Sequence, residues 1–222
     1  MIQAFYEFMA RGGIAMWPLL LLSITSLTLL LERGWYFIRI NRPGQLRQAA
    51  RLGELLRQGE RDGARRLAGQ SEVGLYSRFV SDLLPPATAG GGGGATEAAA
   101  LEAIERHRRR VERFMPTLST IITAAPMLGI LGTVLGIITS FELLGPATQA
   151  TDPRQVSEGI AEALLTTAAG LAVAVVTLFP YNAFRAQVQR TLGRLEALAA
   201  AATSRGDGGV RADHAPAAAG HE

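Results

Sequence analysis

Three long stretches without a charged side chain constrain this sequence more than any other feature. Residues 12–31, 114–141 and 163–184 contain no Asp, Glu, Lys, Arg or His. An α-helix rises about 1.5 Å per residue, so roughly 20 apolar residues cross the roughly 30 Å of hydrocarbon in a bilayer. Each stretch reaches that length. The sequence therefore predicts an all-α membrane protein with three transmembrane helices.

The arginines predict how these helices cross the membrane. All 22 basic residues of the chain are arginine. Fifteen of them lie between Arg33 and Arg113 and five follow the third stretch, whereas Arg11 and Arg154 flank the other ends. Loops rich in Arg and Lys stay on the cytoplasmic side. We therefore expect the N-terminus outside, and the large loop and the C-terminus in the cytoplasm.

Composition and spacing argue against several kinds of site. The chain has no cysteine, so disulfides and thiolate metal sites are excluded. The glycine run 90–94 is followed by Ala-Thr-Glu instead of the Gly-Lys-Ser/Thr of a phosphate-binding loop. His107 stands alone among charged residues, and we expect it to be a solvated helix residue. The net charge of +3 is small, and the arginines cluster beside the spans. We therefore expect no cofactor, metal or nucleic-acid partner.

Turn and cap signals divide the chain into consecutive segments. We expect an outer amphipathic helix over 1–13, the first transmembrane segment over 14–40, a helical cytoplasmic loop over 41–95, a long helix containing the second span over 96–144, a periplasmic loop over 145–152, a long helix containing the third span over 153–202 and a disordered cytoplasmic tail over 203–222. Thr96 provides a cap for the first long helix, and Asp152-Pro153 provides a cap and a first-turn proline for the second. Both long helices are thus predicted to extend from the membrane into the cytoplasm.

The second span is richer in small residues than a simple anchor requires. Gly129, Gly132 and Gly136 recur at about one turn, and Gly170 lies in the third span. Small residues let transmembrane helices approach closely, so we predict that these four glycines pack helices together. Thr133 adds a hydroxyl to the same span. A threonine in a membrane helix can also bond the carbonyl of its own preceding turn, and this alternative applies to Thr133 and Thr167 alike.

The third span begins with an acid and two hydroxyls. Glu162 and Thr166 are one turn apart, and Thr167 follows. A charge in lipid costs up to about 3 kcal/mol near the bilayer centre, and an aqueous lumen removes most of that cost. These residues therefore indicate a polar lining, although Glu162 could equally extend to the headgroups beside Glu158. A proton path needs a titratable relay, and this chain supplies little beyond Glu162.

Two segments resemble the signature sequences of the MotA/TolQ/ExbB proton-channel family. They are APMLGILGTVLGIITSF (Ala125–Phe141) and GIAEALLTTAAGLAVAVVTLFPYNAF (Gly159–Phe184). Three spans with one large loop between the first two are similar to the ExbB/TolQ branch. Leu135 departs from the pattern, because many members carry an aromatic residue at that position.

The resemblance implies a ring-forming stator of the bacterial inner membrane that uses the proton-motive force. In such systems the chain forms a homo-oligomer, a pentamer, around a single-span ExbD- or TolR-like subunit whose aspartate carries the protons. By motif position, Thr133, Glu162 and Thr167 are carried over as lumen-lining residues. Work would pass to a TonB-, TolA- or gliding-type transducer, and the partner decides which system the chain serves. No enzymatic turnover is implied.

Two other functions are weighed against the stator. A membrane scaffold would use the small residues only for packing and would anchor a partner without conducting protons. Such a scaffold should tolerate Gln at Glu162 and Val at Thr167, whereas a channel lining should not. A solute transporter would require inverted repeats or a broken-helix binding site, and the sequence contains neither.

Overall fold

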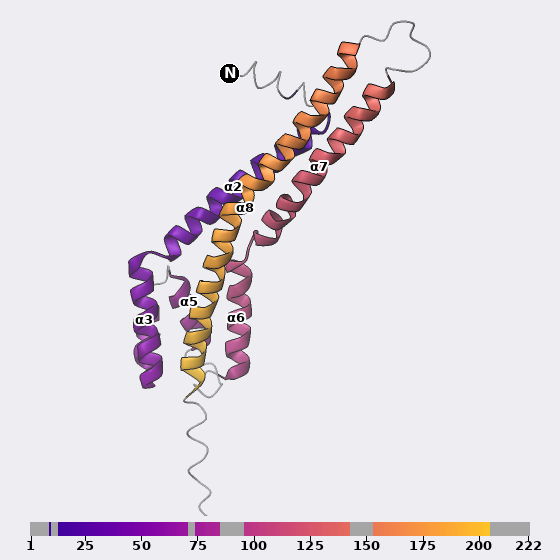
Figure 1. Cartoon of the computed structure of the whole chain (residues 1–222). Helices are drawn as coiled ribbons and strands as arrows, with labels where there is room; N and C mark the ends of the chain where they lie inside the picture. Colours follow the sequence, from indigo (N-terminus) through magenta and orange to yellow (C-terminus); the bar gives the residue numbers. More distant parts are fainter. Residues whose placement is uncertain (1–8, 10–12, 71–73, 85–95, 143–152, 205–222) are drawn as a thin grey trace, which may run out of the picture. The chain divides into compact units, whose positions relative to one another are not determined.

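The chain is helical wherever its structure is described. The computed structural model describes residues 9, 13–70, 74–84, 96–142 and 153–204, and these contain helices and short turns but no strand (Figure 1). The helices are α2 (Met16–Ile40), α3 (Pro43–Gln58), α4 (Arg61–Gly69), α5 (Leu75–Leu83), α6 (Glu97–Val111), α7 (Met115–Glu142) and α8 (Pro153–Thr203). The predicted all-α class is confirmed.

Three of these helices, α2, α7 and α8, are long and apolar enough to cross a membrane, as predicted. Proline and capping residues set the starts of several helices of the chain. α3 starts with Pro43 in its first turn, and α6 is capped by Thr96, whose hydroxyl accepts from the Ala99 amide at 3.3 Å. α8 begins at Pro153 and continues through Pro180 for 51 residues. The expected outer helix over 1–13, the loop over 145–152 and the tail over 203–222 fall almost entirely outside the described residues.

The single helix expected over 96–144 is wrong, because the chain is broken between α6 and α7. Pro116 explains the break: proline lacks an amide proton, and its ring would clash with the carbonyl of Glu112 in a continuous helix. In the first turn of α7 the missing proton has no consequence. Phe114 has φ of 66°, a left-handed conformation that no other described non-glycine residue adopts.

The chain divides into two compact units, which we call the span unit and the loop unit. The span unit comprises Met1–Trp35 and Phe114–Arg185, and the loop unit comprises Tyr36–Arg113 and Ala186–Glu222. The helix α8 therefore contributes its first part to the span unit and its last part to the loop unit. In the span unit, Met16 and Leu19 of α2 are buried in one cluster with Ala125 of α7 and Ala174 of α8.

The loop unit has a core of large apolar side chains from α3, α5 and the end of α8, against which α4 and α6 pack mainly through buried alanines. The fully buried ones include Leu52, Leu56, Tyr76, Phe79, Val80, Leu83 and Leu195. Polar bonds at the edge of this core include Arg194 Nη1 donating to the Tyr76 hydroxyl at 3.2 Å and Arg61 Nη2 donating to the Ala202 carbonyl at 3.2 Å. These contacts hold the end of α8 against α4 and α5.

The expectation that His107 is solvated is wrong. Its side chain is 1% exposed, and Nε2 lies 2.9 Å from Asp82 Oδ2 on α5. Its ring meets the Phe79 ring edge-on with centroids 5.5 Å apart. The helical period explains the burial, because His107 follows Ala103 and precedes Val111 by one turn, and both are buried. The charged neighbours in sequence lie on the other side of α6.

Candidate functional site

The helices α7 and α8 approach each other through glycines. A Cβ added to Gly129 would lie 3.0 Å from Thr167 Cα and 3.1 Å from the Thr166 carbonyl oxygen. A Cβ on Gly170 would lie 2.5 Å from the Ala125 carbonyl oxygen. Gly132 and Gly136 likewise face Thr166 and Ala163. All four glycines that the sequence singled out thus lie at this contact. A larger residue would meet backbone at Gly129 and Gly170, and side chains first at Gly132 and Gly136.

The hydroxyl of Thr167 joins the two helices. Its Oγ1 donates to the Gly129 carbonyl of α7 at 2.8 Å, so it does not bond its own preceding turn. Thr133 does bond its own helix, because its Oγ1 donates to the Ile130 carbonyl at 2.6 Å. A hydroxyl has one donor and two acceptor positions, so both threonines keep oxygen lone pairs for another donor.

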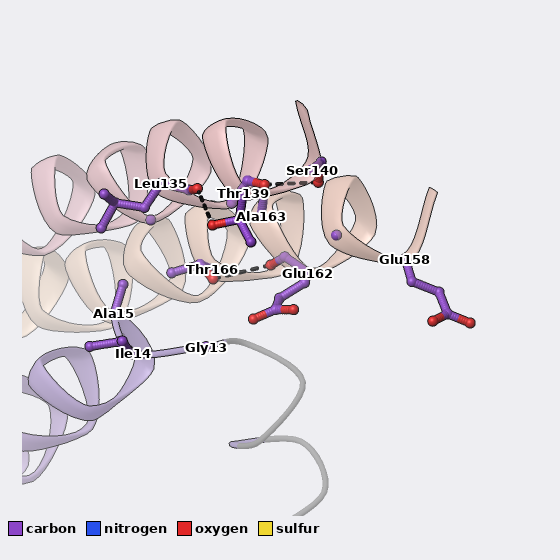
Figure 2. Close-up of a pocket in the computed structure, with 13 residues that line it drawn as sticks. Gly13, Ile14, Ala15, Leu135, Thr139, Ser140, Glu158, Glu162, Ala163 and Thr166 are labelled. Carbon is purple, nitrogen blue, oxygen red and sulfur yellow. Dashed lines mark hydrogen bonds between the residues drawn. The ribbon is translucent and has the colours of Figure 1, made fainter. Parts of the chain in front are cut away.

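Glu162 lies in a pocket of about 560 Å³ in the span unit. The turn before α2, the end of α7 and the start of α8 line this pocket. Figure 2 shows the Glu162 carboxylate directed toward the turn at Gly13, whereas the neighbouring Glu158 points away from the other labelled side chains. A Cβ on Gly13 would lie 2.5 Å from Glu162 Oε1, so Gly13 leaves the room that this carboxylate occupies. Glu162 is half-buried and Glu158 is exposed.

The four predicted lining residues do not form one surface. Thr166 lies in the pocket with Glu162, is 1% exposed and donates to the Glu162 carbonyl at 3.1 Å. Thr133 and Thr167 are not among the residues that line the pocket. Successive helix residues are rotated by about 100°, which separates Thr166 from Thr167. The structure therefore places a pocket pair, Glu162 and Thr166, in a pocket that Thr133 and Thr167 do not line.

One polar contact was missed in the sequence. Ser26 of α2 and Thr177 of α8 have hydroxyl oxygens 2.6 Å apart, and both side chains are buried. Thr177 also donates to the Val173 carbonyl at 2.7 Å, so Ser26 supplies the proton between the two hydroxyls. Thr177 lies about three turns beyond Thr166, and the helical period could have placed both on one face. Nothing in the sequence identified Ser26 as the partner.

The described residues contain no group of three or more His, Asp or Glu side chains placed to hold a metal ion. The span unit offers hydrogen bonding by hydroxyls and carbonyls, and two carboxylates, Glu158 and Glu162, line its pocket. These features define a multi-pass membrane protein whose helices meet through small and hydroxyl-bearing residues.

Comparisons with known proteins identify the family. The model of the MotA/TolQ/ExbB proton channel family matches residues 78–197. The chain is 36% identical over 177 residues to putative biopolymer transport protein ExbB-like 1 of Synechocystis sp., covering 78% of this chain and 67% of that protein. It is 31% identical over 196 residues to ExbB-like 3 of the same organism, covering 83% of this chain and 90% of that protein. It is also 41% identical over 92 residues to the Tol-Pal system protein TolQ of Pseudomonas aeruginosa, covering 41% of this chain and 39% of that protein.

The chain belongs to the MotA/TolQ/ExbB proton channel family, within its ExbB/TolQ branch. The expected family membership is therefore confirmed. The family is one of membrane proton channels and not a known family of enzymes.

Proposed function

We propose that this chain is the ring-forming subunit of an inner-membrane stator driven by the proton-motive force. Several copies, as a pentamer, would enclose a lumen lined by α7 and α8. The membrane helices of a single-span ExbD- or TolR-like subunit would occupy that lumen and supply the carboxylate that carries protons. The arginine distribution supports an arrangement with the N-terminus periplasmic and with the loop unit and the C-terminus cytoplasmic.

The bond from Thr167 to the Gly129 carbonyl is the observation that carries this proposal. It fixes the Thr167 side chain and leaves its oxygen lone pairs available to accept a proton-bearing group. Thr133 is fixed in the same way by its bond to Ile130. Two oriented hydroxyl oxygens that do not titrate suit a lumen lining that faces the protonated carboxyl group of a partner.

The pocket pair would have a separate role. Glu162 and Thr166 sit where α7 ends and α8 begins, which is the outer end of both helices in the proposed orientation. A half-buried carboxylate at this end would draw protons toward the lumen. Each proton that crosses the membrane potential releases about 2.3 kcal/mol per 100 mV. The partner would pass this work to a TonB-, TolA- or gliding-type transducer.

The test compares Glu162→Gln with Glu142→Gln, an exposed carboxylate at the end of α7 that does not line the pocket. Proton flux and energised output are measured for the complex purified with its partner. We expect at least about a tenfold loss for Glu162→Gln and for Thr167→Val, which corresponds to about 1.4 kcal/mol, and no change for Glu142→Gln.

A scaffold without proton conduction is the alternative, and the glycine contacts between α7 and α8 would serve it equally well. If Glu162→Gln and Thr167→Val keep full output in a normally assembled complex, the scaffold describes the chain and the lining proposal is wrong. Thr123→Val is the matched control for Thr167→Val, because Thr123 is exposed and bonds only carbonyls of its own helix, α7.

A further inference from the structure

The loop unit has an open groove between α3 and the end of α8. Its volume is about 420 Å³. Its lining includes small residues, Ala49, Ala50 and Gly53 of α3 and Ala197 of α8, together with Leu46 and Leu198. A Cβ on Gly53 would meet its nearest neighbour, Leu198 Cδ2, at 3.5 Å, an ordinary contact distance. A surface of this kind accepts a protruding apolar side chain.

Two arginines and one carboxylate line this groove. Arg57 and Glu54 come from the end of α3, and Arg194 comes from α8. Glu54 is the one acidic residue of α3, and its pair with Arg57 is long, at 3.9 Å, between two exposed side chains. Helix α3 as a whole holds three arginines against that single carboxylate. The groove therefore favours an acidic partner surface.

Helix α6 of the same chain presents the complementary surface. Leu101 is 62% exposed. Among the described residues of the loop unit, Ile38 of α2 is the one other large apolar side chain that is exposed to this extent. Ala98, one turn earlier, is also exposed. The first part of α6, Glu97–Glu105, holds three carboxylates and no arginine. Glu102 pairs with Arg106 at 2.6 Å and Glu105 with Arg109 at 3.6 Å, whereas Glu97 has no ion pair among the described residues. A single exposed leucine is ordinary on a protein surface, but an exposed leucine flanked by carboxylates matches this groove in both shape and charge.

We propose that Leu101 of one copy inserts into the groove between α3 and α8 of a neighbouring copy. Leu101 and the groove are different surfaces of the same chain, so the contact is head-to-tail. Such contacts generate a closed ring when the rotation between neighbouring copies closes. Glu97 would approach Arg57 or Arg194 of the neighbour. This contact rests on the proposed homo-oligomer and assigns its interface in the loop unit.

The chain contains no cysteine, so introduced thiols report on chosen positions alone. The full-length double variant Ala50→Cys/Leu101→Cys is oxidised in native membranes and separated by non-reducing electrophoresis. A head-to-tail contact gives a ladder of covalent multimers that extends beyond the dimer, whereas either single variant stops at a dimer. The matched control is Ala50→Cys/Arg106→Cys, because Arg106 is also exposed on α6 but is rotated from Leu101 by about 140°.

The expected result is a ladder for the Leu101 pair that is at least tenfold stronger than for the Arg106 pair. Equal ladders, or a fast-migrating monomer from a bond within one copy, would overturn the proposed contact. Light scattering of the purified wild-type complex separates the two levels of the argument. An oligomer without the specific ladder refutes only the Leu101 contact, whereas a monomeric chain refutes both this contact and the proposed ring.

Discussion

The helices of the loop unit meet through large side chains, whereas α7 and α8 of the span unit meet through glycines. Tyr76, Phe79 and Leu83 are fully buried in the loop unit, and a Cβ on Gly129 or Gly170 would touch backbone in the span unit. In water, burying apolar area stabilises by about 25 cal/mol per Å², so large side chains are favoured. In lipid, bringing apolar helices together gives no such hydrophobic stabilisation, so close packing and hydrogen bonds hold the helices together.

The polar contacts of the two units also differ with their surroundings. The loop unit uses side chains of opposite or complementary character, such as His107 with Asp82 and Arg194 with Tyr76. In the span unit, threonine hydroxyls donate to backbone carbonyls, and Ser26 pairs with Thr177. Hydroxyls satisfy their own donors without adding charge to the membrane. The environment of each unit therefore determines which residues hold its helices together.

Truncation in the loop-unit core tests this comparison with the largest expected effect. Phe79→Ala should destabilise the loop unit by about 3–5 kcal/mol, because it removes a fully buried ring and leaves a cavity. Hydrogen exchange of the detergent-solubilised chain measures the loss as faster exchange in α5 and α6. Ser81→Ala on the exposed face of α5 is the control and should change stability by less than about 0.5 kcal/mol. Equal effects from both substitutions would contradict the core that we describe.

Adding a methyl group tests the span unit in the opposite direction. Gly170→Ala should destabilise by about 1–3 kcal/mol, because the new Cβ meets the Ala125 carbonyl. Gly193→Ala, in the same helix but with nothing within 4 Å, should stabilise by up to about 1 kcal/mol through helix propensity. Thermal unfolding of both variants in detergent gives the comparison. Changes in unfolding temperature of the same sign for both variants would contradict the close packing of α7 on α8 at Gly170.

The smallest effect concerns the hydroxyl pair between α2 and α8. Ser26→Ala, Thr177→Val and the double variant form a cycle that isolates the bond between these two side chains. We expect a coupling of about 0.6 kcal/mol and at most about 1.7 kcal/mol, the range found for hydrogen bonds between membrane helices. A coupling indistinguishable from zero would show that this contact does not hold α2 against α8.

The starts of α6 and α8 could be predicted because Thr96 and Pro153 act on their own turns. The break before α7 could not, because a proline in lipid can remain helical, as Pro126 and Pro180 do. The roles of the hydroxyls could not be predicted either. Thr133 bonds its own helix as one alternative foresaw, but the acceptor of Thr167 lies on another helix. Likewise the pocket around Glu162 depends on Gly13, which is distant in sequence.

The break between α6 and α7 has a consequence for how sequences of this kind can change length. In an uninterrupted helix, an inserted residue turns everything after it by about 100°. An insertion near Phe114 leaves the glycines of α7 on the same face of that helix, because neither α6 nor α7 runs through this point. Helix α8 lacks this freedom, since Gly170 and Leu195 depend on one continuous register. We expect natural length variation at the first position and almost none at the second.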